Sequence, residues 1–309
     1  MTGWETSYSM IKKTLCFSNP AHLSLRNHQL VVKLQLDPSQ PVTIPIEDIG
    51  VVLLDHQQIS ITHGALSALV GNNAAVVTCD DRHLPTGLLM PLEGNTLQSE
   101  RFADQIDASL PLRKQLWQQT VSQKILNQAA ILHELTGTEV RCMKVWAESV
   151  KSGDSDNLEG RAAAYYWRNM FDAQWCRDRE GDWPNPLFNY GYAILRAIVA
   201  RALVGSGLLP TLGIHHHNKY NAYCLADDIM EPYRPYVDRA VIQIYADYPD
   251  AIEITTELKR RLLDIPVMDV EIDRRRSPLM VAVTQTTASL AKCYSGEARK
   301  LVYPLIRME

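Results

Sequence analysis

The chain has 309 residues, of which 46% are hydrophobic, and it carries a net charge of −4 with a sequence pI of about 6.1. This length and composition suit two domains, or one large one, with enough apolar residues for a real core. The acidic balance argues against a protein coated in nucleic acid, although it leaves room for a local basic groove. No run of about eighteen apolar residues predicts a membrane span, and the opening residues lack the features of a signal peptide.

The first ninety residues favour a β-rich domain. Short, partly alternating segments predict strands at 14–18, 22–27, 29–36 and 42–46, the last an edge strand because it contains a proline. Continuous apolar runs at 50–55 and 74–80 are typical of strands covered on both faces. The residues between these runs have helical spacing, so we expect a sheet crossed by one helix. Residues 1–9, before a second methionine at Met10, are predicted to be a poorly ordered extension.

Helical patterns dominate the rest of the chain. Residues 82–95 contain two prolines and two glycines and are predicted to be the linker. The residues beyond it have helical periodicity, broken at 136–138 and continuing to Pro304, with an apolar and therefore central helix at 193–207. The sequence thus predicts an α+β protein, with a β-rich N-terminal domain at 1–92 and a larger all-helical domain at 93–309.

Cysteines and charged runs carry little functional signal. The six cysteines are scattered and form no CxxC pair, which excludes zinc-type spacing and favours buried free thiols in a reducing cytoplasm. Two basic runs, at 259–261 and 274–276, are predicted to be solvated helix faces or loops.

Residues 213–235 read GIHHHNKYNAYCLADDIMEPYRP and hold imidazoles and carboxylates closer together than any other stretch. Fifteen residues separate His216 from Glu231, so a loop followed by one helical turn could bring them together. Imidazole nitrogen and carboxylate oxygen are ligands of divalent metals. Alternatively, Asp227 or Asp228 is a helix N-cap. Adjacent histidine side chains point in different directions, so at most one or two of the three could face a common centre.

A third candidate ligand is Glu159, at the start of an alanine-rich helix. A capping box with Asp156 as N-cap explains this residue locally. However, small residues and aromatic residues follow it, and an acid on such a buried helix would need a partner. Glutamate, histidine and glutamate together form an oxygen-rich site that suits magnesium or manganese and phosphoryl-transfer chemistry.

The chain resembles the CRISPR-associated protein 1 family, the integrase of spacer acquisition, and in particular the variety found in type II systems. The resemblance runs from about Met10 to the C-terminus, and several long blocks in the same order carry it. These blocks include IPIEDIGVVLLDH, ITHGALSALVGNNAAVVTCD, NLEGRAAAYYW, LPTLGIHHHNKYN and LADDIMEPYRPYVD.

The resemblance assigns the site. It implies that Glu159, His216 and Glu231 are the catalytic residues and hold Mg²⁺ or Mn²⁺, with Asp228 as a secondary candidate. His215, adjacent in sequence, is the alternative to His216. Two aromatic residues, Tyr165 and Tyr192, match positions beside the site in the family.

The resemblance also implies the reaction and the partners. The 3′-hydroxyl of a short DNA attacks a phosphodiester at the edge of a CRISPR repeat, with nuclease activity as a side reaction. The implied partners are a second copy of this chain in a homodimer, CRISPR-associated protein 2, and double-stranded DNA as prespacer and as repeat. Other type II adaptation proteins and the effector nuclease are further implied partners, in a prokaryotic cytoplasm.

Two alternatives remain open from the residues themselves. One is a metal-dependent hydrolase of a small substrate, which would need a closed pocket, and the other is a non-catalytic DNA-binding scaffold whose acids only cap helices. The first 97 residues carry 5 Lys or Arg and 8 Asp or Glu, whereas the remainder carries 26 and 27. We therefore expect basic residues to gather on one face of the helical domain.

Overall fold

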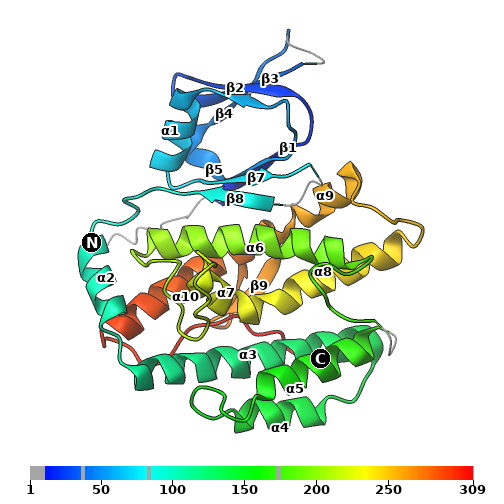
Figure 1. Ribbon diagram of the computed structural model, residues 1–309. Helices are drawn as coiled ribbons and strands as arrows, with labels where there is room; N and C mark the ends of the chain where they lie inside the picture. The colour runs from blue at the N-terminus through cyan, green and yellow to red at the C-terminus, as the bar shows by residue number, and fades with distance from the viewer. Residues whose placement is uncertain (1–10, 36–38, 82–84, 172–174, 309) are drawn as a thin grey trace, which may run out of the picture. The chain divides into compact units, whose positions relative to one another are not determined.

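The computed structural model describes residues 11–35, 39–81, 85–171 and 175–308 (Figure 1). The predicted extension before Met10 lies outside the described residues. The chain divides into two compact units, Met1–Met90 and Pro91–Glu309, called here the β-rich unit and the helical unit. Strands in the first unit and mostly helices in the second confirm the predicted α+β class.

The β-rich unit contains two four-stranded sheets rather than the single predicted sheet. One sheet has the order β1-β5-β7-β8, and the other has the order β4-β3-β2-β6. The strands are β1 (Lys13–Phe17), β2 (Ala21–Arg26), β3 (Gln29–Leu34), β4 (Val42–Pro45), β5 (Ile49–Leu54), β6 (Ser60–Ile61), β7 (Ala75–Cys79) and β8 (Pro85–Leu89). The proline-containing strand β4 is an edge strand, as predicted.

A helix joins two parallel strands of the first sheet. β1, β5 and β7 are parallel, and α1 (His63–Gly71) lies between β5 and β7 in the chain, as the crossover of parallel strands requires. The Thr62 hydroxyl accepts a hydrogen bond from Ala65 N and so caps the helix. A short 3-10 helix, η1 (Ile46–Asp48), leads into β5.

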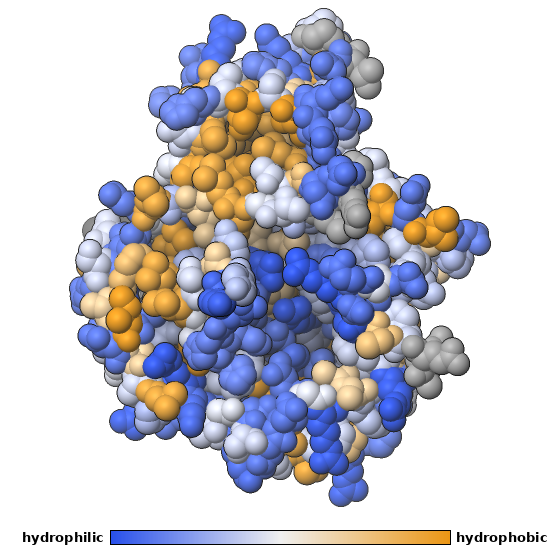
Figure 2. Space-filling view, in the orientation of Figure 1, coloured by the Kyte–Doolittle hydropathy of each residue, from blue (hydrophilic) through white to orange (hydrophobic). Residues whose placement is uncertain are grey.

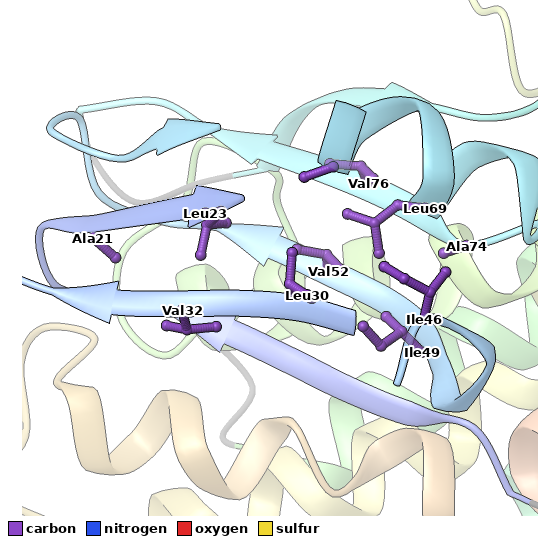
Figure 3. Close-up of a cluster of buried hydrophobic side chains, with 11 residues drawn as sticks. Ala21, Leu23, Leu30, Val32, Ile46, Ile49, Val52, Leu69, Ala74 and Val76 are labelled. Atoms are coloured by element: carbon purple, nitrogen blue, oxygen red, sulfur yellow. The ribbon is translucent and has the colours of Figure 1, made fainter. Parts of the chain in front are cut away.

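Apolar side chains from both sheets and from α1 form one core (Figure 3). Leu23 and Leu30 come from the second sheet, Ile49 and Val52 from the first and Leu69 from α1, and all five are fully buried. Burial of one such side chain contributes about 1.5–3 kcal/mol relative to exposure, so this shared core holds the sheets together.

Strand β8 lies within the predicted linker, so the linker prediction was wrong for residues 85–89. Pro85 and Gly87 indicated a chain break, but an edge strand tolerates proline at its first residue. A side chain at Gly87 would lie 2.5 Å from Thr78 Oγ1 of the paired strand β7, so the glycine serves close strand pairing.

The helical unit is built around α6. Its helices are α2 (Gln98–Ile106), α3 (Leu110–Thr136), α4 (Arg141–Ser149), α5 (Leu158–Met170), α6 (Asn185–Gly205), α7 (Cys224–Met230), α8 (Arg234–Asp247), α9 (Thr256–Leu262) and α10 (Leu279–Tyr294), with 3-10 turns η2 (Glu231–Tyr233) and η3 (Ile265–Val267). Among the described residues, α6 is the helix long and apolar enough to cross a membrane, but 72% of its apolar window is buried inside the protein. Burial on most sides is what its apolar sequence predicts for a central helix.

Two details of the helical unit differ from the sequence prediction. A hairpin of β9 (Asp269–Ile272) and β10 (Arg275–Pro278) interrupts the helices. Asp273 and Arg274 form its two-residue turn with φ of 48° and 62°, a conformation usually signalled by glycine or asparagine. In addition, α10 ends at Tyr294, and residues 297–308 form neither helix nor strand, so helix does not continue to Pro304.

The cysteines are free, as predicted, but their burial varies. Cys224 and Cys293 are buried, Cys16, Cys79 and Cys142 are partly exposed, and Cys176 is exposed. The prediction of buried thiols therefore holds for two of the six.

Candidate active site

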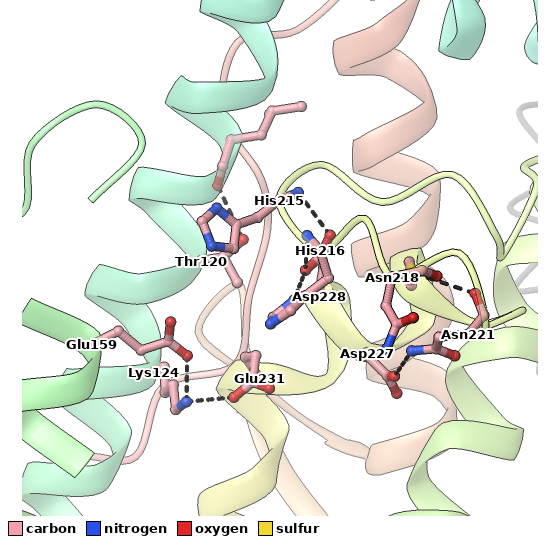
Figure 4. Close-up of polar contacts among 12 residues, drawn as sticks. Thr120, Lys124, Glu159, His215, His216, Asn218, Asn221, Asp227, Asp228 and Glu231 are labelled. Carbon is pink, nitrogen blue, oxygen red and sulfur yellow. Dashed lines mark hydrogen bonds and ion pairs between the residues drawn. The ribbon is translucent and has the colours of Figure 1, made fainter. Parts of the chain in front are cut away.

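Three segments of the helical unit bring the predicted site residues together (Figure 4). They are helix α3, the start of α5, and the segment that runs from the histidine loop through α7 into η2. The central residue is Lys124, which points from α3 toward Glu159 of α5 and Glu231 of η2.

The start of α5 leaves the Glu159 side chain free to face α3. Asn157, with a left-handed φ of 50°, is the N-cap and accepts from Gly160 N, while the Asp154 carboxylate accepts from Leu158 N and Glu159 N. The predicted capping box with Asp156 is therefore wrong. Asp156 instead pairs with Lys151 at the surface, 2.7 Å away.

Lys124 forms a bridge between two carboxylates. Its Nζ lies 2.6 Å from Glu159 Oε1 and 2.6 Å from Glu231 Oε2. Burial lowers the pKa of Lys124, but attraction to Glu231 and Glu159 outweighs burial and raises it above the ordinary value. The lysine is 8% exposed, so its charge is held in a mostly buried setting.

Glu231 is ionised by its neighbours. Burial raises its pKa, but Arg234 and Lys124 lower it more strongly, to about 2. Arg234 Nε donates to Glu231 Oε1 at 2.8 Å. Glu231 Oε2 lies 2.6 Å from Lys124 Nζ, so each carboxylate oxygen of Glu231 has a cationic partner.

The His216 ring is oriented by Asp228. His216 Nδ1 lies 2.5 Å from Asp228 Oδ1, and the same carboxylate accepts from the backbone N–H groups of His215 and His216. Asp228 is fully buried inside α7, not at its N-cap, so the capping alternative was wrong for this residue. The hydrogen bond to Asp228 raises the pKa of His216, while burial opposes that rise. With Nδ1 engaged, Nε2 is the nitrogen available to a ligand.

The neighbouring histidines have different surroundings. His215 stacks on Trp117 of α3, with ring centroids 4.2 Å apart, and burial followed by repulsion from His216 lowers its pKa. His217 lines a cavity of about 410 Å³ that also adjoins His216, Arg113 and Lys219. Of the three imidazoles, His216 is therefore the one that Asp228 orients.

Asp227 serves a structural role. Arg196 of α6 binds its carboxylate through Nε at 2.6 Å and a terminal nitrogen at 3.0 Å, and Asn221 donates to it at 2.7 Å. Like Asp228, Asp227 lies within α7 rather than at its N-cap, and it fixes that helix to α6 and to the loop before it.

The two tyrosines predicted beside the site lie in different places. Arg234, the partner of Glu231, stacks over the Tyr192 ring at 4.6 Å, and the Tyr192 hydroxyl donates to buried Asp238. Tyr165 instead packs on Trp146 of α4 and donates to Glu139 O. Its neighbour Tyr166, which lies seven residues from Glu159 and so on the same helix face, reaches Asp238 at 3.2 Å.

The donor set fits a hard divalent ion in chemistry. Two carboxylates from separate elements converge on one cation position, and an oriented imidazole lies nearby. Among the described residues, however, no three of His, Cys, Asp or Glu are close enough to form a metal cluster as they stand. The ammonium of Lys124, rather than a third ligand, lies between Glu159 and Glu231.

Sequence reasoning missed Lys124 and Arg234. Lys124 shares the buried face of α3 with Trp117, Thr120 and Gln128, at spacings of three and four residues. A lysine in such a stripe needs a buried anionic partner, and that signal was present in the sequence.

Comparison with known proteins identifies clear relatives. The family description "CRISPR associated protein Cas1" matches residues 15–248. A CRISPR-associated endonuclease Cas1 of Neisseria meningitidis serogroup C (strain 8013) is 35% identical over 300 residues, which cover 96% of this chain and 97% of the relative. The protein named CRISPR-associated endonuclease Cas1 2 of Pyrobaculum aerophilum is 30% identical over 264 residues, 80% of this chain and 88% of the relative.

Solved structures share the fold at lower identity. A casposase bound to integration product superposes with a TM-score of 0.80 at 19% identity, over 96% of this chain and 95% of that one. A chain of a Cas6-RT-Cas1–Cas2 complex gives a TM-score of 0.75 at 21% identity, over 96% of this chain and 36% of that one. A CAS1 protein from Thermotoga maritima gives 0.73 at 15% identity, over 92% and 97%.

Proposed function

The chain belongs to the CRISPR associated protein Cas1 family, and on that premise we propose that it is a metal-dependent DNA integrase and endonuclease. The 3′-hydroxyl of a short DNA attacks a phosphodiester at the edge of a CRISPR repeat. A new phosphodiester bond joins the short DNA to the repeat, and the 3′-oxygen of the attacked strand leaves as a hydroxyl. The observation that carries this proposal is the convergence of Glu159 and Glu231 on one cation position beside His216.

Glu159, Glu231 and His216 Nε2 would hold Mg²⁺ or Mn²⁺. Such an ion, when bound, neutralises charge on the phosphate and orients the attacking oxygen. Asp228 acts through His216 and is a positioning residue: its buried carboxylate fixes the ring and so aims Nε2. Arg234 keeps Glu231 ionised, and the guanidinium of Arg234 stacks on the Tyr192 ring.

We assign the partners on the same basis. A solved Cas1–Cas2 complex and a Cas1–DNA complex are among the structures that share this fold. For this chain we propose a homodimer, a CRISPR-associated protein 2 partner and double-stranded DNA. Hydrophobic side chains gather on one face of the β-rich unit in Figure 2, which supports a dimer contact through that unit.

The proposal is tested by strand transfer. The assay contains a short DNA with free 3′-hydroxyls, a repeat-containing target, the partner protein and Mn²⁺. Glu231→Ala and His216→Ala are expected to lower the amount of joined product by about 100-fold or more. Each variant lacks one proposed ligand of the ion that neutralises charge on the phosphate. Glu253→Ala, at an exposed loop position, is the matched control and should retain activity. Equal product from all three variants would refute the site assignment.

Salt dependence separates the integrase from a small-substrate hydrolase. Binding through phosphate contacts weakens steeply as salt rises from about 50 to 200 mM. Joined product should follow that decline, whereas turnover of a small substrate would change little. The third possibility, a non-catalytic scaffold, predicts that Glu159→Ala lowers stability and leaves no activity to lose.

A further inference from the structure

The position between the two site carboxylates belongs to a side chain of the protein itself. Lys124 Nζ lies 2.6 Å from an oxygen of each carboxylate, and its stem is anchored in the middle of the 27-residue helix α3. Arg234 contacts Glu231 from another side, through the other oxygen. Two carboxylates therefore meet two cations, and the cluster is close to neutral without any added ion.

The ammonium and a divalent ion exclude each other from this position. Lys124 Nζ is the cation that both carboxylates contact, at 2.6 Å each, and a divalent ion held by Glu159 and Glu231 would need the same oxygens at roughly 2.0–2.2 Å. Adding two charges beside Lys124 and Arg234 would also leave the buried cluster strongly positive. The four-carbon lysine stem is flexible enough to withdraw the ammonium.

We infer that Lys124 is a built-in counter-cation that holds Glu159 and Glu231 in place without metal and competes with the divalent ion for them. Lys124 is thus a positioning residue, and the inference rests on the metal site proposed above. In this arrangement the two acids are held together before metal arrives, and metal affinity is weaker than the same ligands would give without the lysine.

The test is a titration of the full-length protein with Mn²⁺ alone, by calorimetry and by thermal unfolding. Lys124→Gln removes the charge but keeps an amide that can donate to a carboxylate. It should bind Mn²⁺ roughly tenfold more tightly than wild type, because a competing positive charge is gone. Its melting temperature should lie below wild type in EDTA, and the gap should close as Mn²⁺ is added.

Two further variants complete the design. Lys151→Gln removes a lysine from an exposed pair with Asp156 and should match wild type in both measurements. Lys124→Met removes the one donor that Glu159 and Glu231 share, so it is expected to fold better with Mn²⁺ than with EDTA. If neither Lys124 variant folds even at saturating Mn²⁺, metal does not replace the ammonium and the inference is overturned.

The remaining outcomes separate the inference from the proposed site. If Glu231→Gln abolishes Mn²⁺ binding but Lys124→Gln leaves its affinity equal or weaker, the site stands and the counter-cation inference fails. If wild type and both Glu231→Gln and Lys124→Gln show no specific Mn²⁺ binding, the metal site fails, and the inference fails with it.

Discussion

Glu231 and Asp238 are buried acids seven residues apart, and their pKa values are shifted in opposite directions. Glu231 faces Lys124 and Arg234, whose charges hold its pKa near 2 despite burial. The hydrogen-bond partners of Asp238 are the neutral hydroxyls of Tyr192 and Tyr166. Burial outweighs these hydrogen bonds and the attraction of Arg234 and Arg177, and it raises the pKa of Asp238 to about 7. Direct ion pairs with Lys124 and Arg234 keep Glu231 ionised, whereas Asp238 has hydroxyl groups as its hydrogen-bond partners.

Asp238 should make the protein less stable as pH rises. Its folded pKa of about 7 exceeds the unfolded value of about 3.8, so the folded state binds the extra proton between these values. The stabilisation is complete below about pH 4 and is lost as pH rises through 7. The total loss in unfolding free energy is on the order of 2–4 kcal/mol. Asp238→Asn, which cannot ionise, should flatten this part of the pH profile.

The measurement is the free energy of unfolding in urea at about pH 5 and pH 8. Exposed Asp250 supplies the control, since Asp250→Asn should leave the wild-type profile unchanged. A wild-type loss of stability that persists in full in Asp238→Asn would assign the effect to another group.

Single residues of the site were predictable to different degrees. His216 and Glu231 stood out because imidazole and carboxylate were close in sequence. Glu159 also satisfied a capping pattern, and the resemblance to a known family decided in favour of a ligand. Lys124 went unnoticed because its partners are 35 and 107 residues away, a distance that local periodicity does not bridge.

At the scale of elements, the histidine loop is folded closely over α7. Gly213 begins this loop, and a side chain there would lie 2.4 Å from His216 O and 2.8 Å from Asp228 Oδ2. The glycine thus lets the backbone approach the carboxylate that orients His216.

Gly213→Ala should therefore damage the site by displacing the loop. We expect the unfolding free energy to fall by about 1–3 kcal/mol, which is typical of overpacking. We also expect strand transfer to fall at least as much as in a variant that loses the same unfolding free energy through a substitution elsewhere. Gly64→Ala is the matched control, because nothing lies within 4 Å of a side chain added there. Wild-type activity in Gly213→Ala would show that the close approach has no role.

Most elements followed from sequence periodicity, and the exceptions share a cause. Helix α3 ends at Thr136 with Gly137 in the left-handed conformation, as the predicted break requires. Strand β8 was missed because it is short and its Pro85 and Gly87 indicated a chain break, and the β9–β10 hairpin because Asp273 and Arg274 are unusual residues for its turn. Their stability comes from pairing with a neighbour, and pairing is not visible in one segment alone.

At the scale of the whole molecule, the proposed ligands all belong to one unit. Glu159, His216 and Glu231 lie in Pro91–Glu309, while the β-rich unit has its own core. The acidic excess also lies in the first 97 residues. The predicted gathering of basic residues on one face of the helical unit stays a prediction.

Metal binding should therefore protect one unit selectively. At a Mn²⁺ concentration 100 times its Kd, binding adds about 2.7 kcal/mol to the unit that holds it. Hydrogen exchange measured by mass spectrometry should slow in α3, the start of α5 and residues 213–231, with β1–β8 unchanged. Glu231→Ala should remove the effect. Protection spread equally over both units would contradict this division.

The contacts made by helix α3 determine where the chain can tolerate insertions and deletions. Trp117 stacks on His215, Lys124 bridges the two acids, and Asn127 donates to Pro232 O, all from one continuous helix. One inserted or deleted residue turns everything beyond it by about 100° around the helix axis. The spacing of residues 117–127 along the helix must therefore be kept: the chain can tolerate some substitutions there but no insertion or deletion. Surface loops such as 248–254 have no comparable spacing to keep.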